Sequence, residues 1–122
     1  MLCISRNTRV HSEILIRICI STFSVSRRCA GIFAGENTKI IESSAIFGSE
    51  KKNKAITEYV EENENVYLAY VTDILQDERN RAIGLFEHEG IQGHPGDRGM
   101  KLIAERFLEK FKEISRDSES YY

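Results

Sequence analysis

The stretch KIIESSAIFGSEKKNKAITEYVEENENVYLAYV, residues 39–71, decides the fold class of this chain. Its first part, residues 39–47, is a short β-favouring run that ends at Gly48. Residues 51–63 then carry apolar side chains at helical spacing, and residues 65–71 form a second apolar run of strand type. Two strands joined by a helix of this length form a right-handed βαβ unit with parallel strands. The sequence therefore predicts an α/β fold.

A second helix is predicted near the C-terminus. Its apolar residues recur every three or four positions and form one stripe: Met100, Ile103, Ala104, Phe107, Leu108, Phe111 and Ile114. Asp97 is the expected N-cap, because its carboxylate can accept hydrogen bonds from first-turn amides. We expect this helix to pack on the sheet and residues 115–122 to form a frayed polar tail. Before it, residues 74–81 are expected to form a short helical turn and residues 82–89 an irregular loop.

Composition sets limits on the class of protein. The 122 residues suffice for one domain, and 41% hydrophobic and 30% charged residues with a net charge of −2 are typical of a globular protein. The chain has no overall excess of basic residues of the kind that would indicate nucleic-acid binding. No apolar run approaches the roughly 18 residues that a membrane span requires. The cysteines, Cys3, Cys19 and Cys29, are odd in number and lack metal-site spacing. We therefore expect no disulfide framework, metal or cofactor, and a reducing cytoplasmic location.

The chain changes character near residue 30. Residues 1–30 hold five arginines and one acidic residue, which gives this segment a net charge of +4. Residues 31–122 hold 12 basic and 18 acidic residues, which gives a net charge of −6. The alternation over Ile14–Ile20 predicts one strand and fits an amphipathic transit helix poorly. A secretory signal fits no better, because Arg17 interrupts the apolar run and no clean small-residue cleavage site follows. We interpret residues 1–30 as an atypical Arg/Cys/Ser-rich segment that either contains one strand or is disordered. Residues 31–115 are expected to form the folded part, and residues 116–122 a polar tail.

A His-Pro-Gly turn stands directly before the C-terminal helix and carries the candidate for chemistry, His94. A histidine can take a proton from a serine hydroxyl and return it to a leaving alcohol when a rigid turn holds its ring. Pro95 supplies rigidity by fixing its own φ and favouring an extended His94, and Gly96 lets the chain bend into the helix. His94 is therefore a candidate general base. The structural alternative is a plain turn or capping residue.

The residues around this turn are similar to those of a known family. The segment Asn80–Gly90, followed by Gly93–Met100 and the pair Ile103-Ala104, resembles the C-terminal end of SGNH/GDSL-type ester hydrolases. The resemblance covers about residues 38–115 and implies a partial three-layer α/β/α flavodoxin-like fold that lacks its N-terminal strands. It also implies that His94 is the catalytic general base.

Further site residues follow from the resemblance, with clear departures. Many members have an aspartate three residues before the histidine, where this chain has Ile91, and the Gly-Asp-Ser nucleophile block is absent. Asn37, in Gly35-Glu36-Asn37, is the candidate for the oxyanion hole, and the alternative is that it is only a turn residue. His88 is a candidate to contact substrate, because loops at the carboxyl ends of parallel strands build sites. Ser49 is a poor substitute for the nucleophile.

Two functions of different classes are expected. The first is an SGNH/GDSL-like serine ester hydrolase fragment that takes a small ester and is weakly active or inactive alone. The second is a non-catalytic α/β interaction module that self-associates or pairs with a partner through an exposed sheet edge, since a half-sheet leaves an edge open. The strand at 14–20 could instead cover that edge.

Overall fold

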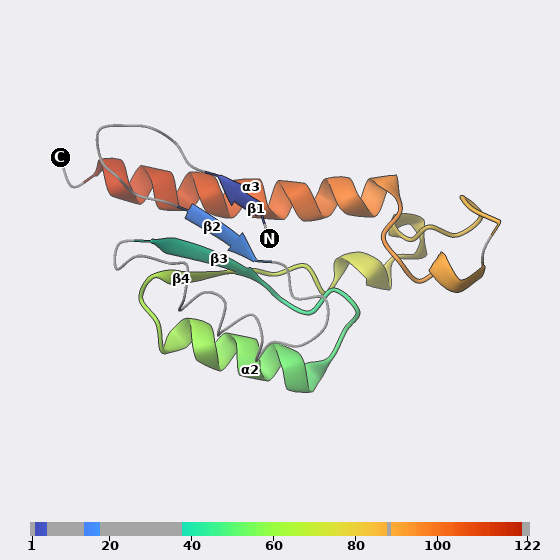
Figure 1. The fold of residues 1–122 in the computed structure, drawn as a ribbon, viewed down its shortest axis with the longest axis horizontal. Coiled ribbons are helices and arrows are strands. Elements are labelled where there is room, and N and C mark those ends of the chain that lie inside the picture. The colour runs from blue at the N-terminus through green and yellow to red at the C-terminus, as the bar shows by residue number, and fades with distance from the viewer. Residues whose placement is uncertain (1, 5–13, 18–37, 88, 121–122) are drawn as a thin grey trace.

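The computed structural model describes residues 2–4, 14–17, 38–87 and 89–120. In it, four strands form one sheet in the order β1-β2-β3-β4, with two long helices packed beside it (Figure 1). The elements are β1 (Leu2–Ile4), β2 (Ile14–Arg17), β3 (Lys39–Ser43), α2 (Glu50–Glu61), β4 (Val66–Ala69), η1 (Ile74–Gln76), η2 (Glu78–Asn80), η3 (Glu89–Ile91) and α3 (Asp97–Glu119).

The predicted strand–helix–strand unit is confirmed. Strands β3 and β4 are parallel, with Ile40 beside Val66 and Ser43 beside Ala69, and α2 connects them. Parallel pairing puts the carboxyl ends of both strands at the same edge of the sheet. The segments that follow these strands therefore start side by side, and the α/β class is confirmed.

The strand predicted within residues 14–20 is present as β2, and residues 18–20 lie outside the described part. β2 pairs in parallel with β3, so that Ile14 lies beside Lys39 and Arg17 beside Glu42. β1 then pairs antiparallel with β2. The edge of β3 is thus covered by β2. This agrees with the prediction that the strand at residues 14–20 covers the edge that would otherwise be open.

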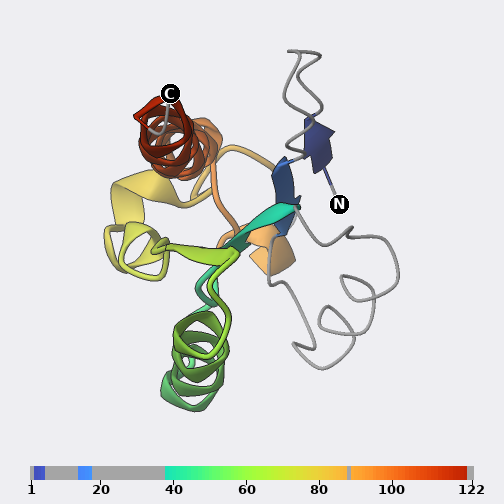
Figure 2. The same ribbon diagram turned by 90° about the vertical axis from the view of Figure 1, so that its left-hand side faces the viewer.

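The two helices lie on opposite faces of the sheet (Figure 2). Successive residues of a strand point to opposite faces, and β3 shows this directly. Ile40 packs with Val66 against side chains of α2, whereas Ile41 belongs to the larger core that includes Phe107 and Ile114 of α3. A fully buried isoleucine stabilises a fold by roughly 1.5–3 kcal/mol, so both faces contribute to the core.

Helix α3 is longer and less buried than predicted. It continues to Glu119, so residues 115–119 are helical rather than a tail. Met100 and Leu108 of the predicted stripe are at least half exposed, because the buried face is narrower. The N-cap is Gly96 rather than Asp97, which is the first helical residue. Its negative charge still lies in the first turn, where the helix dipole favours it.

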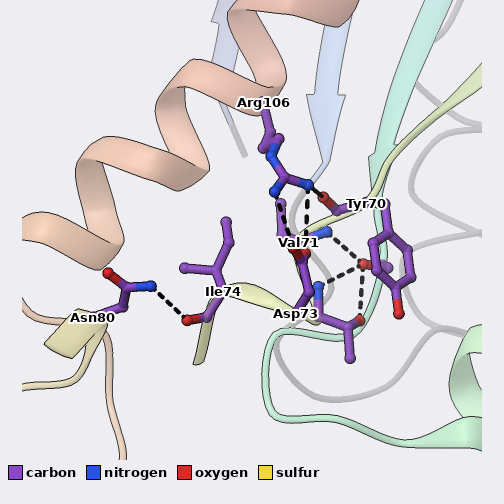
Figure 3. A network of polar contacts seen from close by, with 8 residues as sticks. Tyr70, Val71, Asp73, Ile74, Asn80 and Arg106 are labelled. Carbon is purple, nitrogen blue, oxygen red and sulfur yellow. Dashed lines mark hydrogen bonds and ion pairs between the residues drawn. The ribbon is translucent and has the colours of Figure 1, made fainter. Parts of the chain in front are cut away.

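A guanidinium fixes α3 to the segment that follows β4. Arg106 Nη1 donates to the Tyr70 carbonyl at 2.9 Å, and Nη2 donates to Asp73 Oδ2 at 2.9 Å (Figure 3). Nearby, Asn80 Nδ2 donates to the Ile74 carbonyl at 2.8 Å. This hydrogen bond links η2 to η1, the two short helices that form in place of the single helical turn expected at residues 74–81. Within the described residues, no helix is long and apolar enough to cross a membrane.

Candidate functional site

The turn that carries His94 is braced by the segment after β4. Arg81 and Pro95 form an antiparallel bridge. It is flanked by two backbone hydrogen bonds, from Ala82 N to the His94 carbonyl at 2.8 Å and from Gly96 N to the Asn80 carbonyl at 2.9 Å. The rigidity that the sequence assigned to proline is therefore reinforced by two hydrogen bonds. Both residues next to Pro95 are fixed to the 80–82 segment.

Two glycines allow this close contact. A Cβ at Gly96 would lie 2.9 Å from the Arg81 carbonyl oxygen, and a Cβ at Gly99 would collide with the Asn80 carbonyl oxygen. Gly96 has φ −81°, which any residue can adopt, so the close approach to Arg81 rather than its backbone angles requires glycine where the chain enters α3. Both glycines are needed because α3 starts directly against the backbone of residues 80 and 81.

The imidazole of His94 is exposed and packs edge-on against a phenyl ring. The ring centroids of His94 and Phe47 are 5.1 Å apart and the ring planes make an angle of 77°. Phe47 lies in the turn between β3 and α2. Among the described residues, the ring nitrogens of His94 have no hydrogen-bond partner, and its backbone N–H donates to the Ile91 carbonyl at 3.0 Å. The imidazole is therefore oriented by an apolar contact and open to a ligand.

A cavity of about 250 Å³ lies at the carboxyl ends of β3 and β4, and His94 is not among the residues that line it. Such an edge is where open parallel sheets bind their ligands. His94 adjoins the cavity through its neighbour Gly93 and through Phe47, both of which line it. Thr72 and Leu75, from the segment after β4, line it as well.

A buried hydroxyl network supports one wall of the cavity. Ser44 Oγ accepts from Val71 N at 2.7 Å and from Thr72 N at 3.1 Å. The two hydroxyls lie 2.9 Å apart, Thr72 Oγ1 donates to the Ala45 carbonyl at 2.6 Å, and Asn53 Nδ2 donates to Thr72 Oγ1 at 3.1 Å. Because these contacts occupy Ser44 fully, it is a structural residue rather than a nucleophile.

Arg81, directly after η2, is the charged side chain that lines the cavity, whereas Asp77 and Arg79 of the same region do not line it. Arg81 lines the cavity, and its Nε donates to the Leu75 carbonyl at 2.6 Å. Asp77 caps η2 by accepting from Arg79 N at 3.0 Å and from the Arg79 guanidinium at 2.7 Å. The Arg79 side-chain hydrogen bonds, followed by that backbone hydrogen bond, lower the pKa of Asp77 from 3.8 to about 2.

The other predicted site residues are not joined to His94 in the described part of the chain. Asn37 and His88 lie outside the described residues. Ser49 Oγ accepts from Lys52 N at 3.3 Å and caps α2, so it has a structural role. No hydrogen bond links a described serine to His94, and residues 2–4, 14–17, 38–87 and 89–120 contain no cluster that could hold a metal ion.

Three residues of the site were missed by the sequence-based prediction. Phe47 was counted only as part of a strand, Gly99 was given no role, and Arg81 was counted only as part of a helical turn and the resemblance. The spacing of Gly96 and Gly99 was the one available signal, because a helix that begins with two glycines often contacts another backbone. Comparisons with protein-family models, curated proteins and solved structures found no match.

Proposed function

We propose that residues 38–115 are the C-terminal part of an SGNH/GDSL-type serine ester hydrolase, with His94 as its general base. The observation that supports this most directly is the contact of the exposed His94 ring with Phe47, a residue that lines a cavity at the carboxyl ends of two parallel strands. The two backbone hydrogen bonds that flank the Arg81–Pro95 bridge fix the turn. A general base needs such a fixed position, because its nitrogen must lie within about 3 Å of the hydroxyl that it deprotonates. The helices on both faces of the sheet agree with the three-layer architecture of this family.

The chemistry of such a site is acyl transfer. A serine oxygen would form a bond to the ester carbonyl carbon while the histidine takes the serine proton. The histidine then gives this proton to the leaving alcohol as the carbon–oxygen bond breaks, and water releases the acid by the same steps. Backbone amides and Asn37 would hold the oxyanion. In this chain only the base is matched, since Gly-Asp-Ser is absent and Ile91 occupies the position of the orienting aspartate.

We therefore expect weak hydrolysis that depends on His94. The test uses the whole chain and p-nitrophenyl acetate, with His94→Gln as the variant and Gln92→Ala, an exposed neighbour in the same turn, as the matched control. Hydrolysis above the buffer rate that is retained in Gln92→Ala and lost in His94→Gln supports a general base. Equal rates in all three proteins would contradict general-base catalysis by His94.

The alternative proposal is a non-catalytic module that associates through its sheet edge. β4 supports this alternative, because it is an end strand of the sheet and pairs with β3 alone among the described strands. An end strand offers backbone groups to another strand. Sedimentation equilibrium of the whole chain tests it: a concentration-dependent dimer supports association, whereas a monomer at all concentrations contradicts self-association.

A further inference from the structure

The cavity beside His94 combines apolar walls with a single cation. Among the described residues that line it, Ile46, Phe47 and Leu75 are apolar, and Arg81 is the one charged side chain. No described carboxylate lines the cavity. Polar groups that converge on an otherwise apolar pocket determine which ligands it selects. Here the charge of the ligand should therefore be decided by Arg81.

The guanidinium of Arg81 is held in place before any ligand binds. Its Nε donates to the Leu75 carbonyl at 2.6 Å, and about a third of the side chain, 32%, is exposed. The nearest carboxylate, that of Glu78, lies 3.9 Å from Nη1 and is 78% exposed, so its attraction is weak. Within the described part of the chain, Nη2 has no partner. A planar guanidinium in this position can bind a carboxylate at little entropic cost.

Neighbouring charges do not compete strongly for this group. The carboxylate of Asp77 is occupied by Arg79, which donates to it at 2.7 Å from its guanidinium and at 3.0 Å from its backbone. The carboxylate of Asp73 accepts from the guanidinium of Arg106, whose Nη2 donates to Oδ2 at 2.9 Å. The acids in this region are therefore engaged by other arginines, and Arg81 keeps a donor for a ligand.

We propose that this cavity binds a small carboxylate through Arg81, and that the ester substrate is a short-chain monoester of a dicarboxylic acid. Its free carboxylate would pair with Arg81 while its ester carbonyl lies toward His94. The anion site stands on the cavity alone, whereas the substrate class rests on the ester hydrolase function proposed above. Paired charges of this kind give strong, directional hydrogen bonds.

The size of the cavity limits the ligand. A volume of about 250 Å³ equals about eight water molecules at roughly 30 Å³ each. A four-carbon dicarboxylate has a similar number of non-hydrogen atoms and would fill this space. A long fatty acyl chain would extend beyond it. The cavity therefore has room for a short acyl group that carries a carboxylate.

The experiment is an amide NMR titration of the whole chain with succinate and with succinamide, its neutral counterpart of the same shape. We expect saturable shifts at Leu75, Gln76 and Gly93 with succinate and much weaker binding of succinamide. Arg81→Gln should weaken succinate binding on the order of tenfold or more, as expected for the loss of a charge-assisted hydrogen bond. Arg79→Gln is the matched control, because it removes the same charge two residues away from a guanidinium that binds Asp77.

Each outcome decides the proposal. Equal binding of the two ligands by the wild-type chain, an absence of saturable shifts, or equal loss in both arginine variants would overturn the anion site. The comparison of ligands on the wild-type chain holds even if Arg81→Gln fails to fold. Hydrolysis of monomethyl succinate and methyl butyrate is measured separately. Succinate binding without turnover of either ester would leave the anion site standing and reject the hydrolase.

Discussion

The imidazole of His94 rests edge-on against the phenyl ring of Phe47, with ring centroids 5.1 Å apart. The two residues are 47 positions apart in the sequence and come from the ends of different units, the turn after β3 and the turn before α3. The positive edge of one aromatic ring is attracted to the negative face of another, and such pairs contribute about 0.5–1.5 kcal/mol. This contact joins the candidate base to the sheet.

Replacing Phe47 should release the histidine ring without unfolding the protein. In Phe47→Ala we expect the His94 ring proton resonances to shift toward random-coil positions, because the neighbouring aromatic ring is lost. The free energy of unfolding should fall by about 0.5–1.5 kcal/mol, the value of an aromatic pair. Leu108→Ala, which truncates another half-exposed apolar side chain, is the control and should leave the His94 resonances unchanged. Identical His94 spectra in Phe47→Ala and wild type would contradict the contact.

Replacing Gly99 should destabilise the start of α3. A Cβ there would collide with the Asn80 carbonyl oxygen and lie 3.1 Å from Pro95 Cβ. Alanine has the higher helix propensity by up to about 1 kcal/mol, but overpacking costs about 1–3 kcal/mol, so we expect Gly99→Ala to unfold at lower urea concentration. Gly93→Ala is the matched control, because a Cβ at Gly93 meets no atom within 4 Å. A Gly99→Ala variant more stable than wild type would refute the close approach.

Removing the Ser44 hydroxyl should weaken the junction between β3 and the segment after β4. In Ser44→Ala the backbone amides of Val71 and Thr72 lose their acceptor in a buried site, which costs about 1–3 kcal/mol. Ser115→Ala, which removes a hydroxyl that donates to a carbonyl within α3, should change stability far less. Urea denaturation measures both variants, and an equal effect would show that the network is not specific.

The carboxylate of Asp77 should titrate at unusually low pH. Its pKa is lowered to about 2, first by the side-chain hydrogen bonds from Arg79 and then by the backbone hydrogen bond. Because the folded state holds this proton less tightly than the unfolded state, the contribution of Asp77 to stability is fully present above pH 3.8 and is lost as pH falls through about 2. A carbon-detected NMR titration should give a midpoint near 2. In Arg79→Gln the midpoint should rise toward 3.8, whereas Lys112→Gln should leave it unchanged.

Much of the fold was predictable because it depends on local periodicity. The strand–helix–strand unit at residues 39–71 follows from two β-favouring runs and the helical spacing between them, and the apolar face of α3 follows from helical spacing. The N-cap and the end of α3 were predicted wrongly, since both depend on contacts at the helix ends. Gly96 is the N-cap because its backbone is extended, with ψ −172°, and its carbonyl accepts from Met100 N at 2.9 Å.

The sequence by itself determined the α/β class, the parallel pair of β3 and β4 and the His-Pro turn before the last helix. Tertiary structure decided what that turn contacts: Phe47 beside the ring, Arg81 opposite Pro95, and a cavity between them. The reason is physical. Periodicity reports which face of an element is buried, whereas a site is assembled from the ends of several elements, and their separations exist only once the sheet and α3 have packed.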